Sequence, residues 1–304
     1  MLPAWRLFRL TFAGRRIPGQ STGKGRRLIL IPPGRAAVSG TFAFLSYFRR
    51  MIRRTTRRVA AALALVGLEA LALVAVWLLC VSIVLGFGAW WLRTGAFSFD
   101  ADAFALADAL RARLPGLTHV MVAFTWLGTQ YALVPAGLGL LAWFAFYKRH
   151  RWHSWRVPLV TLGSLLLDGL LKVTYQRPRP LIPHLVPAHG LSYPSGHAMV
   201  AASFWGLLWW LVRRHLQPGF GRSLALMAFP LIALLVGLSR VYLHVHYASD
   251  VLAGFAAGLA WLLASLAFLR ILERRAARRE AAAEAAAELD EAPAPLSIPP
   301  PEKK

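Results

Sequence analysis

Long apolar runs separated by short polar segments dominate this chain. A membrane-spanning helix needs about 20 mostly apolar residues, and six stretches provide one, although some of them are shorter. They lie near residues 70–91, 119–145, 157–174, 197–212, 223–239 and 249–270. The pattern therefore predicts an all-α fold, an integral membrane bundle of six transmembrane helices.

The composition supports a membrane protein. Hydrophobic residues make up 57% of the 304 residues, above the share of about half in soluble domains. The net charge of +22 would suggest a nucleic-acid binder, but the basic residues lie between apolar runs and form no stripe on one face. We therefore expect the lipid bilayer and no nucleic acid as a partner. Cys80, the single cysteine, excludes an intrachain disulfide and a cysteine metal site.

Charged residues between the apolar runs predict the orientation of the chain. Basic residues are enriched in cytoplasmic loops, and they cluster after the second run (Lys148, Arg149, Arg151, Arg156) and the fourth (Arg213, Arg214, Arg222). The segment after the first run has no net charge, with Arg93, Arg111 and Arg113 against Asp100, Asp102 and Asp108. We therefore expect a multi-pass protein of the cell inner (plasma) membrane with cytoplasmic termini. Residues 175–197 and 239–250 then lie on the periplasmic or extracellular side.

Both ends of the chain lie outside the predicted membrane domain, which covers residues 59–272. Residues 1–58 contain 14 Lys and Arg and no acid, and such a segment cannot bury a core. This predicts a basic, disordered cytoplasmic tail, and Met1 and Met51 both stay open as its start. Residues 273–304 predict a cytoplasmic helical extension followed by a Pro-rich tail.

Charged residues are rare in the second half of the chain. Asp168 and Asp250 are the only acids between residues 109 and 272, and Lys172 is the only lysine between 149 and 302. The spacing of four places Asp168 and Lys172 on one helical face, which predicts an ion pair. Charges inside membrane spans are usually functional, although a pair that only anchors the helix stays open.

Two segments after this pair have features of a phosphate site. In the stretch from Gln176 to Pro180, two prolines hold the chain extended, so we expect Arg177 and Arg179 to face outward beside Lys172. Guanidinium forks suit phosphate oxygens. The sequence Tyr-Pro-Ser-Gly-His at 193–197 predicts a capped helix start whose free amides can bind an anion, with His197 at its rim.

A third cluster carries a candidate nucleophile. Ser239 and Arg240 are followed by His246 and by Asp250 at the start of the last span. A spacing of four on a helix places His246 and Asp250 on one face, where the carboxylate can hold one ring nitrogen and leave the other free to attack. The remaining histidines singled out as structural or accessory are His119, His184, His189 and His244.

With these residues in view, the chain resembles the type 2 phosphatidic acid phosphatase and vanadium haloperoxidase superfamily, in its membrane lipid phosphatase branch. Three motifs carry the resemblance over roughly residues 60–272, namely Lys172 with Arg179-Pro180, then Pro194-Ser195-Gly196-His197, then Ser239-Arg240 with His246 and Asp250. The resemblance implies that Lys172, Arg179, Arg240, Ser195 and the Gly196 amide bind phosphate. It also implies that His246 attacks phosphorus, that Asp250 orients His246, and that His197 protonates the leaving oxygen.

The predicted function is metal-independent hydrolysis of a lipid phosphate or lipid diphosphate at the outer membrane face through a phosphohistidine, with no cofactor. A lipid phosphotransferase stays open. The six spans argue against a vanadate-dependent haloperoxidase, and the presence of His246 and Asp250 argues against a non-catalytic lipid-phosphate binder or transporter. The motifs do not decide between phosphatidate, phosphatidylglycerol phosphate, undecaprenyl diphosphate and a lipid A phosphate.

Overall fold

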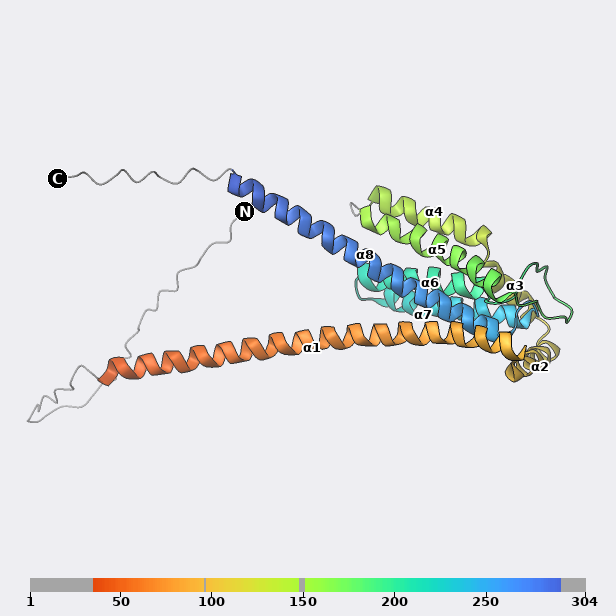
Figure 1. The fold of residues 1–304 in the computed structure, drawn as a ribbon, viewed down its shortest axis with the longest axis horizontal. Helices are drawn as coiled ribbons and strands as arrows, with labels where there is room; N and C mark the ends of the chain where they lie inside the picture. Colours follow the sequence, from red (N-terminus) through yellow and green to blue (C-terminus); the bar gives the residue numbers. More distant parts are fainter. Residues whose placement is uncertain (1–34, 96, 148–150, 291–304) are drawn as a thin grey trace, which may run out of the picture. The chain divides into compact units, whose positions relative to one another are not determined.

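The computed structural model describes residues 35–95, 97–147 and 151–290, and every regular element in this part of the chain is a helix (Figure 1). The helices are α1 (Arg35–Thr94), α2 (Ser98–Arg113), α3 (Leu117–Trp126), α4 (Gln130–Tyr147), α5 (Arg151–Tyr175), α6 (Gly196–His215), α7 (Phe220–Tyr242) and α8 (Ala248–Asp290). The predicted all-α membrane fold is confirmed. Helix α2 was not predicted, because its segment is too polar to resemble a span.

Four helical segments in the described ranges are long and apolar enough to cross a membrane: Gly67–Thr94, Trp155–Tyr175, Phe220–Tyr242 and Ala248–Ala287. Helices α3 and α4 together provide a fifth candidate, bent by 47° where they meet. The predicted count of six is therefore approximate. Helix α6 falls outside this set, and it packs against α5, α7 and α8.

The chain divides into two compact units, residues Met1–Ala64 and Leu65–Lys304. In the first unit, residues 35–58 are helical where the sequence predicts a disordered tail, since helical hydrogen bonds form within one segment and need no core. The side chains of residues 48–56 are exposed. Residues 1–34 lie outside the described ranges, and the predicted domain boundaries stay predictions.

Two glycines on α8 allow close packing against α6. A Cβ atom on Gly254 would lie 2.5 Å from the carbonyl oxygen of Ser195, and one on Gly258 would overlap the carbonyl oxygen of Met199. Small residues spaced by four let membrane helices approach through their backbones. This contact brings the start of α8 next to the start of α6, where the Ser195 amide donates to the Asp250 carbonyl oxygen over 3.0 Å.

Polar side chains connect the remaining helices of the second unit. Ser203 on α6 donates to Ser164 on α5 over 3.1 Å, and the Trp261 indole on α8 donates to the Leu159 carbonyl oxygen over 3.1 Å. Hydrogen bonds of this kind between membrane helices contribute about 1 kcal/mol each. Because the hydrophobic effect drives helix association only weakly inside a bilayer, these hydrogen bonds help to align α5 with α6 and α8.

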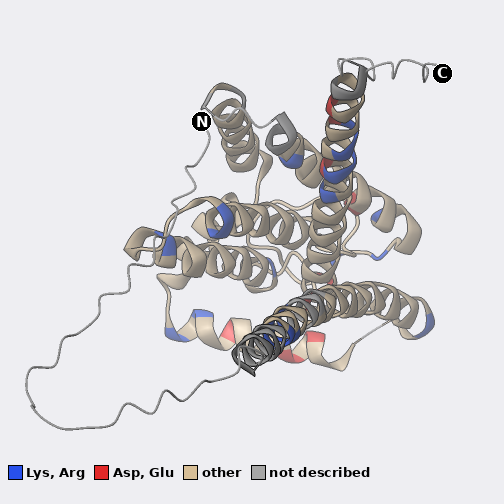
Figure 2. Ribbon diagram, turned by 90° about the vertical axis from the view of Figure 1, so that its left-hand side faces the viewer, with Lys and Arg blue, Asp and Glu red and all other residues tan. Residues whose placement is uncertain are grey.

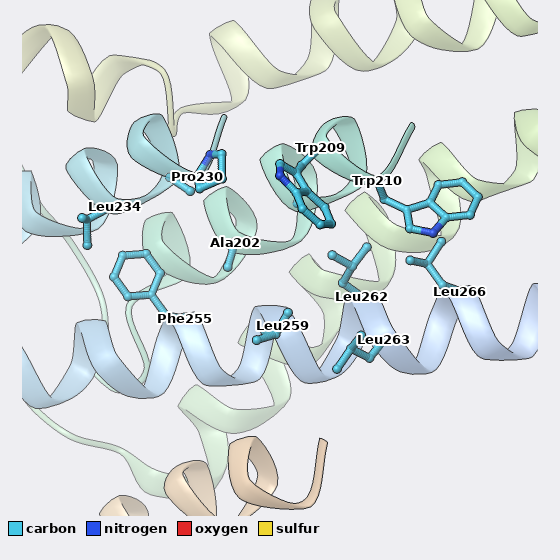
Figure 3. A pocket seen from close by; sticks show the side chains of 12 residues that line it. Ala202, Trp209, Trp210, Pro230, Leu234, Phe255, Leu259, Leu262, Leu263 and Leu266 are labelled. Atoms are coloured by element: carbon cyan, nitrogen blue, oxygen red, sulfur yellow. The ribbon is translucent and has the colours of Figure 1, made fainter. Parts of the chain in front are cut away.

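An apolar groove of about 360 Å³ lies between α6, α7 and α8 (Figure 3). Its wall includes Trp209, Pro230, Leu234, Phe255 and Leu266, and none of the motif residues lines it. The charged chemistry of the molecule therefore lies elsewhere. Beyond its apolar part, α8 continues as a helix that carries both basic and acidic residues, coloured blue and red in Figure 2.

Candidate active site

Three motif-bearing segments meet at one end of the bundle. The segment between α5 and α6 is joined to the turn after α7, because the Leu185 amide donates to the Leu243 carbonyl oxygen over 3.1 Å. The bond from Ser195 to Asp250 joins the same segment to α8. All eight predicted site residues lie on these segments or on the helix ends next to them.

The candidate nucleophile, His246, is 2% exposed and lies in the turn before α8. Its Nδ1 is 3.6 Å from Oδ2 of the fully buried Asp250. The expectation that both residues share a helical face is wrong, since α8 begins only at Ala248. The turn nevertheless brings the two side chains together.

Ser192 lies between these two side chains and was not predicted. Its hydroxyl donates to Asp250 Oδ2 over 2.5 Å and is 3.3 Å from His246 Nδ1. A hydroxyl can accept one hydrogen bond while it donates another. Ser192 can therefore link the ring N–H of His246 to the carboxylate of Asp250.

The other ring nitrogen of His246 faces a cation. Nε2 lies 3.1 Å from Nη1 of Arg179, which also donates to the Val245 carbonyl oxygen over 2.6 Å. Burial, and then the charges of Arg240, Arg179 and Lys172, hold the pKa of His246 well below its usual value. The ring is therefore neutral at pH 7, the form that a nucleophile requires.

Arg240, at the end of α7, is buried and held by a residue outside the motifs. Its Nη1 donates to Thr125 Oγ1 over 2.6 Å, and its Nε is buried without a hydrogen-bond partner in the described part of the chain. Thr125 lies near the end of α3, just before the bend into α4. At this bend, a Cβ atom on Gly128 would lie 3.0 Å from the ring of His197. The bend therefore packs directly against two site residues.

The start of α6 has the features of an anion site. Ser195 occupies the N-cap position without a side-chain capping bond, and its hydroxyl is buried with no partner among the residues that the structure places. The free amides of a helix N-terminus attract anions. Asp168 lies against Gly196, where a Cβ atom would be 2.9 Å from Oδ2, so a larger residue here would have to displace the carboxylate.

The predicted ion pair on α5 is present. Lys172 Nζ donates to both carboxylate oxygens of Asp168, over 2.7 Å and 2.5 Å, and both side chains are largely buried. An ammonium group has three protons. Lys172 therefore keeps one donor for a phosphate oxygen.

The prediction for Arg177 is wrong. It was expected to face outward with Arg179, but it is 1% exposed and points into the bundle. It donates to Asp250 Oδ1 over 2.6 Å, to Ser249 Oγ over 2.7 Å and to Asp100 Oδ2 over 2.9 Å. Two carboxylates from distant segments outweigh the exposure that the neighbouring prolines favour.

Comparison with known proteins identifies the family. A family model described as PAP2 superfamily matches residues 153–274. Phosphatidylglycerophosphatase B of Bacillus subtilis (strain 168) is 35% identical over 169 residues, which cover 55% of this chain and 82% of that protein. The chain belongs to the PAP2 superfamily. It is a multi-pass membrane protein and a lipid phosphatase of this family.

A solved structure also resembles this PAP2 protein. It is the crystal structure of the first transmembrane PAP2 type phosphatidylglycerolphosphate phosphatase from Bacillus subtilis, with a TM-score of 0.54 and 31% identity. The similarity covers 62% of this chain and 94% of that one. Undecaprenyl-diphosphatase BcrC of the same organism (strain 168) is 29% identical over 148 residues, covering 45% of this chain and 70% of that protein.

The sequence analysis did not identify three residues of the candidate site: Ser192, Thr125 and Asp100. Ser192 stands two positions before Pro194, so its nearness to a motif was a usable signal. Thr125 precedes a Leu-Gly pair that interrupts an apolar run, which is a weaker signal. Asp100 was counted only as a loop charge, and no local pattern marks it as buried.

The accessory histidines stay near the edge of the site. His244 Nε2 lies 3.1 Å from Asp108 Oδ1, and the backbone carbonyl of His189 accepts a hydrogen bond from Arg179 over 2.9 Å. The ring of His184 contacts the Pro180 carbonyl oxygen at 3.0 Å. Their structural or accessory role stays a prediction.

Proposed function

We propose that this PAP2 protein hydrolyses a lipid phosphate or lipid diphosphate at the outer membrane face, without a metal, through a phosphohistidine on His246. One observation carries the proposal: Nδ1 of His246 faces Ser192 and Asp250, while Nε2 faces Arg179. One ring nitrogen is thereby held, and the other points toward a cationic cluster that fits a phosphoryl group.

In the first step, Nε2 of His246 attacks phosphorus and the bond from phosphorus to the lipid oxygen breaks. Lys172, Arg179, Arg240, the Ser195 hydroxyl and the Gly196 amide bind the phosphoryl oxygens. Guanidinium groups match the spread of charge over these oxygens in the transition state. The lipid oxygen leaves with a proton from His197, whose protonated form the incoming phosphate charge favours.

In the second step, water attacks the phosphohistidine, its proton passes to His197, and the bond from nitrogen to phosphorus breaks. Inorganic phosphate leaves, and both histidines return to their starting forms. Asp250 stays ionised throughout and stabilises the positive charge that the phosphorylated ring of His246 carries, with Ser192 as the link. His197 thus gives one proton to the lipid oxygen and regains one from water, so the protons balance over the two steps.

The proposed side of the membrane rests on charge. The ends of α5 and α7 that carry Lys172 and Arg240 lie opposite the connection between α6 and α7, which Arg213 and Arg214 at the end of α6 and Arg222 at the start of α7 flank. Basic connections favour the cytoplasm. We therefore place the site on the periplasmic or extracellular side of the cell inner membrane, with both termini cytoplasmic.

A substrate panel tests the proposed activity. Purified protein in detergent is assayed for phosphate release from phosphatidylglycerol phosphate, undecaprenyl diphosphate, phosphatidate and a lipid A phosphate. The names of the similar proteins favour the first two lipids as substrates. Phosphate release that His246→Ala abolishes is the expected result. Release that persists in this variant would refute the nucleophile, and transfer to an added lipid without phosphate release would identify a phosphotransferase.

A further inference from the structure

Arg177 is a buried cation that the proposed phosphoryl transfer does not use directly. It makes no hydrogen bond to the residues proposed to hold phosphate, and it lies between the carboxylates of Asp250 and Asp100. The ring of Tyr247 packs 4.0 Å from its guanidinium carbon, and the ring of Trp91 packs 4.8 Å from it. Aromatic faces stabilise a buried guanidinium and restrict its movement.

Asp100 secures the far side of this arginine from α2. Its Oδ2 accepts from Arg177 and from the Ser249 hydroxyl over 2.7 Å, and its Oδ1 accepts from the Ser249 amide over 2.8 Å. Ser249 lies in the first turn of α8, so Asp100 satisfies one of the free amides at the start of this helix. Asp100 therefore positions both Arg177 and the helix that carries Asp250.

Of the three hydrogen bonds that the Asp250 carboxylate accepts in the described ranges, one comes from this arrangement. Its Oδ2 accepts from Ser192 and from the Tyr247 amide, whereas its Oδ1 accepts from Arg177. A fully buried carboxylate is costly unless a cation and hydrogen bonds compensate its charge. Without Arg177, Asp250 would lose its cation and the contact that fixes its orientation.

We propose that Asp100 and Arg177 are positioning residues for phosphoryl transfer, because together they hold Asp250 ionised and oriented toward Ser192 and His246. Helix α2 is then a part of the catalytic apparatus and not only a connection between α1 and α3. This inference rests on the proposed phosphohistidine mechanism. Neither residue is among those proposed to bind the phosphoryl group, so we expect their effect to reach the reaction through Asp250 and His246.

The test compares Asp100→Asn and Arg177→Lys with a matched control, Asp108→Asn. Asp108 also lies on α2 and also pairs with an arginine, Arg111, over 2.7 Å, but that pair makes no contact with Asp250. Two quantities are measured in detergent: the single-turnover rate of phosphoenzyme formation from p-nitrophenyl phosphate, and the inhibition constant of inorganic phosphate. The first depends on the orientation of His246, and the second on the phosphate-binding residues alone.

We expect both test variants to form the phosphoenzyme roughly 100-fold more slowly, as for a reacting group displaced by about 1 Å. Their inhibition constants for phosphate should equal that of the unaltered protein, and Asp108→Asn should match it in both measurements. Arg177→Met should be slower than Arg177→Lys, because methionine supplies neither the charge nor a donor. The inference would be overturned if the test variants formed the phosphoenzyme as fast as the unaltered protein. It would also be overturned if their loss of rate were matched by an equal loss of phosphate binding.

Three further outcomes are distinguishable. If Arg177 variants do not accumulate in the membrane, Asp100→Asn decides alone, since asparagine keeps the shape and one acceptor oxygen. If the unaltered protein forms no phosphoenzyme on His246, the proposed mechanism itself fails and this inference fails with it. If it does form one and Asp100→Asn reacts equally fast, only the positioning role is refuted.

Discussion

Nη1 of Arg179 lies 3.1 Å from Nε2 of His246 while it donates to the carbonyl oxygen of the adjacent Val245. The arginine is therefore tied to the backbone of the turn that carries the candidate nucleophile. A phosphoryl oxygen bound by Arg179 would lie close to the ring nitrogen proposed to attack phosphorus. Such proximity is a large part of what an enzyme contributes to phosphoryl transfer.

Replacement of His246 by alanine should abolish turnover of every substrate. No other nucleophile faces both Arg179 and the Ser192–Asp250 pair in the described ranges, so we expect a loss of at least about 10⁴-fold in kcat. The measurement is phosphate release from the lipid panel, together with trapping of a radiolabelled phosphoenzyme. A trapped phosphoenzyme in His246→Ala would contradict the assignment.

His197→Ala should separate leaving groups. If His197 protonates the departing oxygen, its loss should slow transfer from a lipid phosphate by about 10² to 10⁴-fold. An aryl phosphate such as p-nitrophenyl phosphate should be affected much less, because its leaving group is already stable as an anion. Single-turnover measurements of phosphoenzyme formation are needed, since His197 also acts in the hydrolysis step. Equal losses with both substrates would indicate a role in phosphate binding.

The lowered pKa of His246 predicts how stability depends on pH. An unfolded chain protonates this histidine below about pH 6.5, whereas the folded chain keeps it neutral. The unfolded state then binds more protons, so His246 destabilises the fold as the pH falls, by up to about 1.4 kcal/mol per pH unit. His246→Asn should lose less of its thermal stability between about pH 7.5 and about pH 5.5 than the unaltered protein. An identical loss in both would show that folding leaves the pKa of His246 unchanged.

Cysteine labelling tests the side of the membrane on which the site lies. In a Cys80→Ala background, a membrane-impermeant thiol reagent should label His189→Cys in intact cells and should leave Gln217→Cys unlabelled. His189 lies between α5 and α6, next to the site, and Gln217 lies in the connection between α6 and α7. Permeabilised cells provide the control, because both positions are exposed and should then react. The reverse pattern would invert the proposed topology.

Orthovanadate and a chelator test the absence of a metal from the mechanism. Lys172, Arg179 and Arg240 supply positive charge that could otherwise come from a metal ion. Orthovanadate should therefore inhibit phosphate release, and EDTA should leave it unchanged. Strong inhibition by EDTA that an added divalent cation reverses would refute the metal-independent reaction.

The fold and most of the candidate site could be predicted from local features. The apolar runs predict helices because a span must be long and apolar, and the four-residue spacing of Asp168 and Lys172 predicts an ion pair that the structure contains. The helix start at Gly196 follows from the residues before it. The count of spans was less secure, since α6 is shielded by its neighbours and need not be strongly apolar.

The sequence by itself determined the membrane bundle, the segments that carry the motifs and the residue types available for phosphate chemistry. Only the tertiary structure decided that Arg177 turns inward, that Ser192 links His246 to Asp250 and that Asp100 supports Arg177. The partners in the last two cases are 58 and 77 residues apart along the chain. Periodicity and motif spacing describe neighbours within one segment, whereas a buried carboxylate takes its partners from whichever segments the packing of helices brings beside it.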